Sequence, residues 1–119
     1  MPAEHRIRIA RIYDDIDPDD GTRVLVDRLW PRGVSKTRAQ LDEWCRDIAP
    51  STGLREWYHH EPELFDEFAS RYEAELADCA ALEELRKLTT RGVVTLVSST
   101  RSLDISHAAV LAKLLKGPQ

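Results

Sequence analysis

Val93-Val94-Thr95-Leu96-Val97 is the most continuous run of strand-forming residues in this chain of 119 residues. Such β-branched and aliphatic side chains favour an extended backbone that is buried on both faces. A second apolar stretch, Thr22 to Val26, predicts another strand, and about 65 mostly helical residues separate the two stretches. A parallel pair of strands requires a connection of this kind. The two stretches therefore predict an α/β protein in which both strands end at the same edge of the sheet.

The rest of the chain supplies one more strand and the helices. Isoleucines alternate with charged residues at positions 6–12, which predicts an edge strand with one solvated face. Capping residues, prolines and apolar periodicity predict five helices: from the Ser35 cap to Pro50, from the Ser51 cap through Tyr58, from Pro62 through Leu76, over 81–88, and over 105–116 behind an Asp104 cap. In the first of them, the apolar face is formed by Leu41, Trp44, Cys45 and Ile48.

The predicted fold class is therefore α/β. We expect a small mixed sheet of about three strands, two of them parallel, packed by four to five helices in a single domain over residues 1–119. With 42% hydrophobic residues, the chain can bury one core but not two.

The net charge and the hydropathy of the chain argue against nucleic acid and membranes as partners. A formal net charge of -4 and a pI near 5.5 argue against a protein that coats phosphate backbones, so nucleic acid is not an expected partner. No apolar stretch approaches the roughly 20 residues of a membrane helix. Residues 1–11 alternate charge with isoleucine instead of forming the apolar run of a signal peptide. We therefore expect a cytoplasmic protein with no membrane partner.

Two features that can signal metal or redox chemistry are interpreted as structural. Cys45 and Cys79 lie far apart in amphipathic helical surroundings, outside any Cys-x-x-Cys pattern, and are predicted to be small buried hydrophobes. The aspartate-rich loop at 14–21 carries Asp20 and Val26 where a calcium-binding EF-hand needs glycine and glutamate. Neither a metal nor a cofactor is predicted.

Charged and hydroxyl residues gather where the two central strands should end, and ligands of open α/β sheets bind beyond the carboxyl ends of the strands. Arg32 follows the first strand, in a tight turn that should expose it. Ser98, Ser99 and Arg101 follow the second strand and precede the start of a helix, where they could cradle a phosphate or a carboxylate. The same residues also fit an ordinary polar loop between a strand and a helix.

Two residues at this edge are candidates for proton transfer. If the strand persists beyond Val26, Asp27 and Arg28 point to opposite faces, so one should turn inward, either into a structural ion pair or toward a ligand. His107 falls in the first turn of the last helix, where the helix dipole favours the neutral imidazole that acts as a base. A core histidine bonded to a backbone carbonyl is the alternative. Arg55, on the short helix behind the Ser51 cap, can reach the same edge.

The string Arg23-Val24-Leu25-Val26-Asp27-Arg28-Leu29-Trp30-Pro31-Arg32-Gly33 closely resembles a motif of the YeaO-like family of uncharacterised proteins (DUF 488). Further matches spread over nearly the whole chain: Ala49-Pro50-Ser51, Leu54-Arg55-Glu56-Trp57, Phe68, Arg71-Tyr72, Glu75-Leu76, Thr95-Leu96 and His107-Ala108. The resemblance implies a compact cytoplasmic α/β domain and no assigned activity.

The resemblance also marks motif positions, without giving any of them a role: Asp27, Arg28, Trp30, Arg32, Ser51, Arg55, Trp57, Arg71, Tyr72 and His107. The chain departs from its relatives after the last predicted strand. Where they usually carry an aromatic residue, alanines and an asparagine before the histidine, it carries Ser98, Ser99, Thr100 and Ser106. The hydroxyl cradle is therefore expected to be peculiar to this chain.

The predicted site combines these observations. The catalytic candidates are Asp27 and His107, and the ligand-binding candidates are Arg28, Arg32, Ser51, Arg55, Ser98, Ser99 and Arg101. Three hypotheses follow. The first is a pocket for a small anionic ligand bearing phosphate or carboxylate, with or without catalysis. The second is a regulatory or adaptor protein that binds a protein or nucleic acid through tryptophan and arginine. The third assigns these residues to a homo-oligomer interface.

Overall fold

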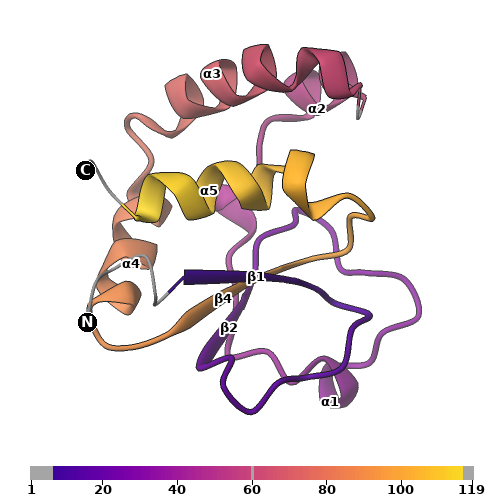
Figure 1. The fold of residues 1–119 in the computed structure, drawn as a ribbon, viewed down its shortest axis with the longest axis vertical. Helices are drawn as coiled ribbons and strands as arrows, with labels where there is room; N and C mark the ends of the chain where they lie inside the picture. Colours follow the sequence, from indigo (N-terminus) through magenta and orange to yellow (C-terminus); the bar gives the residue numbers. More distant parts are fainter. Residues whose placement is uncertain (1–6, 60, 117–119) are drawn as a thin grey trace.

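The computed structural model describes residues 7–59 and 61–116 and contains a four-stranded sheet (Figure 1). The strands lie in the order β1 (Ile7–Arg11), β4 (Val94–Ser98), β2 (Thr22–Leu25) and β3 (Glu43–Trp44), and every neighbouring pair is parallel. The three predicted strands are present, β1 lies at an edge, and β2 pairs with β4 in parallel as expected. The sheet has one strand more than predicted and is parallel throughout instead of mixed.

The additional strand lies where the sequence predicted a helix from Ser35 to Pro50, and that prediction is wrong. Helix α1 (Lys36–Ala39) ends after one turn at Gln40, which has a left-handed backbone with φ 47°. The chain then pairs with β2, because the backbone N–H of Asp42 donates to Arg23 O at 2.9 Å and that of Cys45 donates to Leu25 O at 2.8 Å. A short 3₁₀ helix, η2 (Arg46–Ile48), follows.

The apolar residues of this segment explain the error. Their helical spacing suggested one buried face, but they serve both faces of the sheet. Leu41 packs with the smaller core cluster, whereas Cys45 and Ile48 pack with the larger one on the opposite face. A segment that threads past the edge of a sheet can therefore mimic the periodicity of an amphipathic helix.

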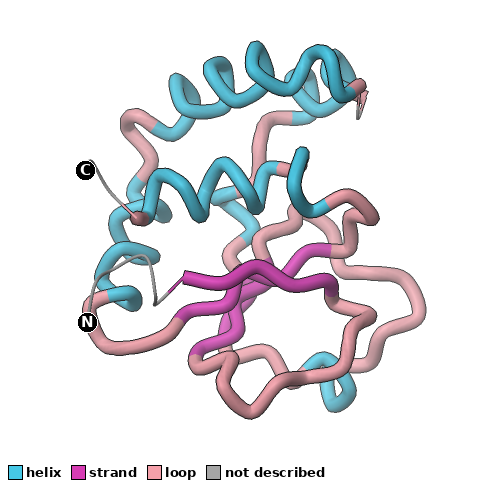
Figure 2. The backbone as a smooth tube through the Cα atoms, in the orientation of Figure 1, coloured by secondary structure: helices cyan, strands magenta, loops and turns pink. Residues whose placement is uncertain are grey.

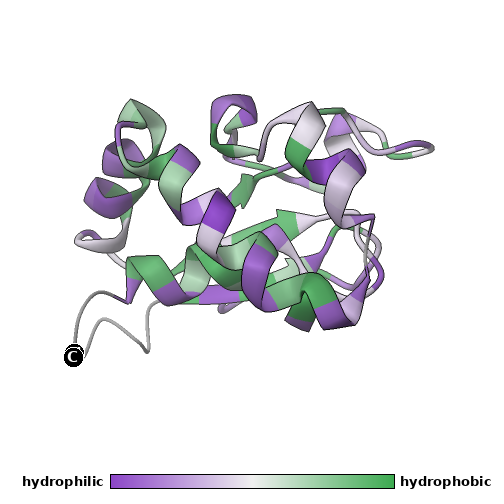
Figure 3. Cartoon of the chain, turned by 90° about the horizontal axis from the view of Figure 1, so that it is seen from above, coloured by the Kyte–Doolittle hydropathy of each residue, from purple (hydrophilic) through white to green (hydrophobic). Residues whose placement is uncertain are grey.

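The remaining helices match the prediction closely: α2 (Thr52–Tyr58), α3 (Phe65–Leu76), α4 (Ala80–Thr89) and α5 (His107–Leu115). Helix α5 lies directly on the sheet, α2 and α3 form a layer above α5, and α1 lies below the sheet (Figure 1). Along these helices, hydrophobic and hydrophilic residues alternate (Figure 3). No helix within the described residues is long and apolar enough to cross a membrane.

The start of the last helix differs from the prediction. Leu103–Ile105 form a 3₁₀ helix, η4, and α5 begins only at His107. Its N-cap residue is Ser106, with φ -105° and ψ 170°, instead of the predicted Asp104. The extended backbone at Ser106 interrupts the helical path, so His107 becomes the first residue of α5.

Two hydrophobic clusters flank the sheet because successive strand residues point to opposite faces. Val24, Val26 and Leu96 belong to the larger cluster, which faces α3, α4 and α5, whereas Leu25 and Val97 belong to the smaller one. Cys45 and Cys79, predicted to be buried, are free thiols and are half-buried against the larger cluster.

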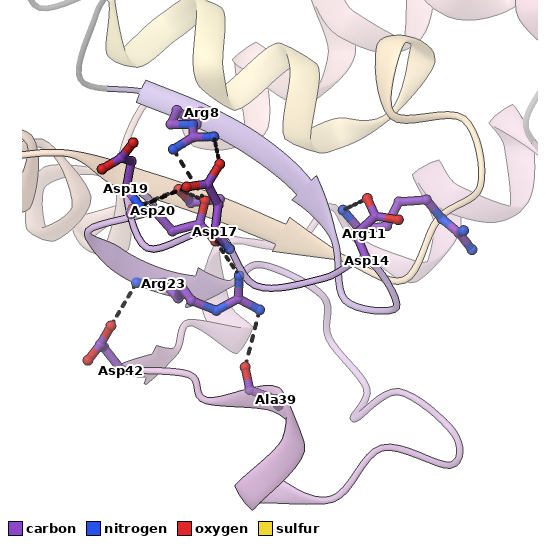
Figure 4. A network of polar contacts seen from close by, with 10 residues as sticks. Arg8, Arg11, Asp14, Asp17, Asp19, Asp20, Arg23, Ala39 and Asp42 are labelled. Carbon is purple, nitrogen blue, oxygen red and sulfur yellow. Dashed lines mark hydrogen bonds and ion pairs between the residues drawn. The ribbon is translucent and has the colours of Figure 1, made fainter.

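At the amino ends of the strands, the sheet carries a polar cluster (Figure 4). The buried carboxylate of Asp20 accepts a hydrogen bond from Arg23 Nη1 at 2.7 Å, and Arg8 lies 3.4 Å from its second oxygen. The buried hydroxyl of Thr95 donates to Asp20 O at 2.7 Å. Arg23 Nη2 also donates to Ala39 O at 3.1 Å. This cluster ties the loop before β2 to β4 and to α1.

Gly21 is needed at the entrance to β2. Its φ is +64°, and an added Cβ would lie 2.2 Å from Val93 O, which already accepts the Thr22 N–H at 2.9 Å. We expect Gly21→Ala to lower the free energy of unfolding by more than about 1 kcal/mol. The matched control is Gly53→Ala in α2, which has open space around the added Cβ and should stabilise by up to about 1 kcal/mol. Urea unfolding of both variants measures this, and equal effects would contradict it.

Candidate functional site

A cleft of about 580 Å³ opens at the carboxyl ends of β2 and β4. The loops after β1 and β4 leave the sheet on the same side (Figure 2). Seven of the nine residues predicted for the site line the cleft: Asp27, Arg28, Arg32, Arg55, Ser98, Ser99 and His107. The parallel arrangement brings them together, because each follows a strand that ends at this edge or lies on a helix packed above it.

The other two predicted residues lie outside the cleft lining. Ser51 caps α2, where its hydroxyl accepts the Leu54 N–H at 3.2 Å. The backbone N–H and the hydroxyl of Ser51 also donate to the Glu75 carboxylate of α3, at 2.9 and 2.5 Å. Arg101 is exposed in the loop after β4. Ser51 thus joins α2 to α3, and Arg101 faces solvent.

Asp27 is the most heavily hydrogen-bonded side chain of the cleft. Its Oδ1 accepts from the Ser98 hydroxyl at 2.7 Å and lies 3.1 Å from His107 Nε2. Its Oδ2 accepts from the backbone N–H and the hydroxyl of Ser99, both at 2.8 Å. Burial raises the pKa of the Asp27 carboxyl, but the hydrogen bonds and the charge of His107, with the bonds from Ser99 and Ser98, lower it to about 2.

Asp27 and Arg28 both follow β2, which ends at Leu25, and Asp27 is the one that turns inward. The side chain of Asp27 is 13% exposed, and its partners are two serines and a histidine, not Arg28. The serine hydroxyls that were expected to cradle a ligand donate to Asp27. They therefore join the ends of β2 and β4.

The sequence left two alternatives for His107, a residue of the site or a core histidine bonded to a backbone carbonyl, and the structure combines them. Its Nε2 lies 3.1 Å from Val26 O as well as 3.1 Å from Asp27 Oδ1, and both atoms are acceptors, so Nε2 carries a proton. The ring packs edge-on against Tyr72 at 71°. His107 is thus a histidine bonded to a backbone carbonyl that also lines the cleft.

Arg28 lies half-buried in the cleft wall without a counter-charge. Its Nη2 donates to Ala49 O at 3.2 Å and to Pro50 O at 3.4 Å, and its buried Nε has no hydrogen-bond partner. Within residues 7–59 and 61–116, no carboxylate forms an ion pair with Arg28. A guanidinium bonded only by carbonyl groups remains able to attract an anion.

Two more arginines reach the cleft from its rim. Arg32 is exposed beside Gly33, which has φ +74°, and Arg55 is exposed on α2. Neither pairs with a carboxylate among the described residues. The Tyr13 hydroxyl donates to Arg32 O at 3.3 Å, which links the loops after β1 and β2. Glu56 is the only lining carboxylate besides Asp27 in the described part of the chain.

Some lining residues were missed from the sequence, although signals for two of them were present. Tyr58 lies three residues after Arg55 on α2, a spacing that places both on one helix face. Tyr13 follows β1, and the carboxyl end of β1 lies at the same edge because β1 is parallel to β4. Tyr58 also donates a hydrogen bond to Ile105 O at 2.7 Å, which joins α2 to the segment before α5.

Of the three tryptophans, two are half-buried and one is exposed. Trp30 and Trp57 are half-buried, and Arg71, which also pairs with Glu67 at 2.8 Å, stacks over Trp57 at 4.2 Å. Trp44 is 37% exposed, and its Nε1 donates to Asp27 O at 2.8 Å. The Trp44 indole N–H therefore fixes the backbone carbonyl of Asp27, whereas the Asp27 carboxylate accepts from Ser98 and Ser99.

The fold and the cleft define a small parallel α/β protein with a charged, open site at the carboxyl ends of its strands. The chain belongs to the family described as the inactive DUF488-N3 subclade, DUF488-N3i, whose family model matches residues 6–118.

Its relatives share this length and are uncharacterised. Proteins named as uncharacterized from Mycobacterium bovis and Mycobacterium tuberculosis are each 65% identical to it over 117 residues, covering 98% of this chain and 99% of theirs. The uncharacterized protein YeaO of Escherichia coli is 41% identical over 111 residues, covering 92% of this chain and 96% of YeaO. No solved structure matches the chain. The resemblance to the YeaO-like family is confirmed, and the relatives assign no function.

Proposed function

We propose that the cleft binds a small anionic ligand, bearing a phosphate or a carboxylate, and that the protein acts by binding this ligand without converting it. The observation that carries the proposal is Arg28. Its half-buried guanidinium is bonded only by the carbonyl groups of Ala49 and Pro50, and no carboxylate of the described chain pairs with it, so its positive charge is left for an anion in the cleft. Arg32 and Arg55 add two further cations at the rim of the same cleft, and neither pairs with a carboxylate of the described residues.

The start of helix α5 supports the same chemistry. Ser106 and His107 line the cleft, and the first N–H groups of a helix carry partial positive charge. The Ser106 hydroxyl does not cap them, because it donates to Leu103 O at 2.7 Å instead. The N–H groups of Ala109 and Val110 donate to Ser106 O, so the N–H groups of His107 and Ala108 are the ones left at the start of the helix to favour an anion.

The bonding of Asp27 argues for binding over catalysis. A carboxylate has about four acceptor sites, and the two Asp27 oxygens are already approached by two donors each. A general base works best with a pKa near the working pH, whereas the pKa of Asp27 is about 2. We propose that Asp27 positions His107 and Ser99, and that His107 contacts the ligand. The description of the family as an inactive subclade supports this assignment.

The test is a thermal-shift titration with inorganic phosphate, pyrophosphate and succinate. A ligand at about a hundred times its dissociation constant adds about 2.7 kcal/mol, which raises the melting temperature of a small protein by several degrees. We expect this rise in the wild type and its loss in the triple variant Arg28→Ala, Arg32→Ala, Arg55→Ala, which removes every arginine that lines the cleft.

The matched control is Arg101→Ala, which removes an exposed arginine outside the cleft and should keep the full rise. Equal rises in all three proteins would show binding elsewhere on the surface and overturn the proposal. The absence of any rise across the three anions would also overturn it.

A further inference from the structure

A second hollow of about 600 Å³ adjoins the cleft and shares two wall residues with it, Arg28 and Leu29. The rest of the second hollow is formed by the β3 and η2 segment, including Trp44 and Arg46, and by Ala81 of α4. Leu29 is 71% exposed, although a leucine side chain favours burial by about 2 kcal/mol. The wall shared by the two hollows therefore presents the apolar side chain of Leu29 to solvent, beside the Arg28 guanidinium, which has no carboxylate partner in the described part of the chain.

Trp44 and Arg46 are held in place before any partner arrives. The Trp44 ring packs edge-on against Trp30 at 5.3 Å, and its Nε1 is fixed by the hydrogen bond to Asp27 O. The Arg46 guanidinium lies 4.7 Å from the centre of the Trp44 ring. Tryptophan and arginine dominate binding energies at protein interfaces, and side chains already fixed lose little entropy on binding.

The hollow also borders an open edge of the sheet. β3 pairs with β2 on one side, and no described strand pairs with its other side. Such an edge offers backbone N–H and C=O groups to an extended chain. A small ion needs none of these features, whereas a peptide can use the exposed Leu29 side chain, the fixed Trp44 ring and the strand edge together.

The arginines that line the second hollow favour a peptide with acidic side chains. Arg28 and Arg46 face the second hollow, and neither pairs with a carboxylate among residues 7–59 and 61–116. Asp47 is the one acidic residue of its lining within that part of the chain. Together the two linings carry four arginines and three carboxylates among the described residues, a positive balance in a chain whose net charge is -4.

We propose that the two hollows form one continuous docking surface for an acidic peptide segment of a protein partner. One carboxylate of the segment lies in the cleft, another pairs with Arg46, and an apolar side chain between them packs on Leu29 and Trp44. The inference rests on the proposed function for the cleft and extends that anion site to a longer occupant. Polynucleotides fit less well, because Arg46 already stacks on the Trp44 ring and the chain is acidic as a whole.

The experiment measures fluorescence polarisation with three labelled probes: the peptide Glu-Glu-Leu-Glu-Phe-Glu, its Gln-for-Glu counterpart, and a single-stranded hexadeoxynucleotide. We expect the acidic peptide to bind and Arg46→Glu to weaken it at least about tenfold, which corresponds to about 1.4 kcal/mol. Leu29→Ser should weaken it as well. The control Arg38→Glu reverses an exposed arginine on α1, which lies below the sheet, and should leave binding within about twofold.

The outcomes separate this inference from the proposed function. If Arg46→Glu keeps the melting-temperature rise with phosphate or succinate but loses the peptide, both stand. If small anions bind and the acidic peptide does not, the anion site stands and the peptide surface is overturned. Tighter binding of the oligonucleotide or of the Gln-for-Glu peptide, or equal weakening by Arg38→Glu, also overturns the peptide surface. Failure of every anion and of the peptide overturns both.

Discussion

Asp20→Asn is expected to lower the free energy of unfolding by about 3 to 5 kcal/mol, the largest effect of any single substitution considered. The side chains of Asp20 and Arg23 are 6% and 5% exposed and lie 2.7 Å apart. Asparagine keeps the shape of Asp20 and one oxygen acceptor but removes the charge, so the Arg23 guanidinium stays buried without this counter-charge and with an unbonded Nε. Urea unfolding at neutral pH measures the loss.

Two variants test whether the loss arises from the buried charge. Glu84→Gln removes one partner of an ion pair with Lys87 whose side chains are 71% and 67% exposed, and should cost no more than about 1 kcal/mol. The double variant Asp20→Asn, Arg23→Met removes both buried charges and should recover part of the loss. A loss below about 1 kcal/mol for Asp20→Asn, or no recovery in the double variant, would contradict the prediction.

The polar cluster at Asp20 also shows what the sequence could not reveal. The aspartates of loop 14–21 were predicted to form a turn without metal, but nothing local indicated that Asp20 is buried. Its partners Arg23, Arg8 and Thr95 come from three different strands. A buried ion pair becomes visible only when the strand order is known, because it is a property of the assembled sheet.

Features that depend on the chain alone could be predicted from the sequence, whereas features that depend on neighbouring strands could not. The parallel pairing of β2 and β4 was predictable, because hydrophobic runs and the length of the connection are properties of the chain itself. That pairing placed five of the seven predicted lining residues at one edge, whereas Arg55 and His107 are supplied by helices α2 and α5. β3 was not predictable, because two exposed residues, Glu43 and Trp44, form a strand only through the neighbouring β2 backbone. The partners of Asp27 were missed for the same reason, since Ser98, Ser99 and His107 reach it across the sheet.

Asp27→Asn is expected to lower stability by about 2 kcal/mol at neutral pH, with a loss that depends on pH. The pKa of the Asp27 carboxyl falls from its usual 3.8 to about 2 in the folded protein. One pKa unit corresponds to about 1.4 kcal/mol. Since the folded state holds this proton less tightly than the unfolded state, the carboxylate contributes its full stability above about pH 4. That contribution is lost as the pH falls through the range between 3.8 and about 2.

Urea unfolding of the wild type and Asp27→Asn between pH 7 and pH 2 tests this directly. Other carboxyl groups titrate over the same range in both proteins, so the difference between the two stability curves isolates Asp27. We expect that difference to be constant above about pH 4 and to shrink toward pH 2.

Asp78→Asn controls for the loss of one negative charge, because Asp78 is exposed and forms no ion pair with a described residue. A difference that stays constant down to pH 2 would show that the Asp27 carboxylate is not held by Ser98, Ser99 and His107 as described. The ends of β2 and β4 would then be joined by uncharged contacts, and the positioning role proposed for Asp27 would fall with that result.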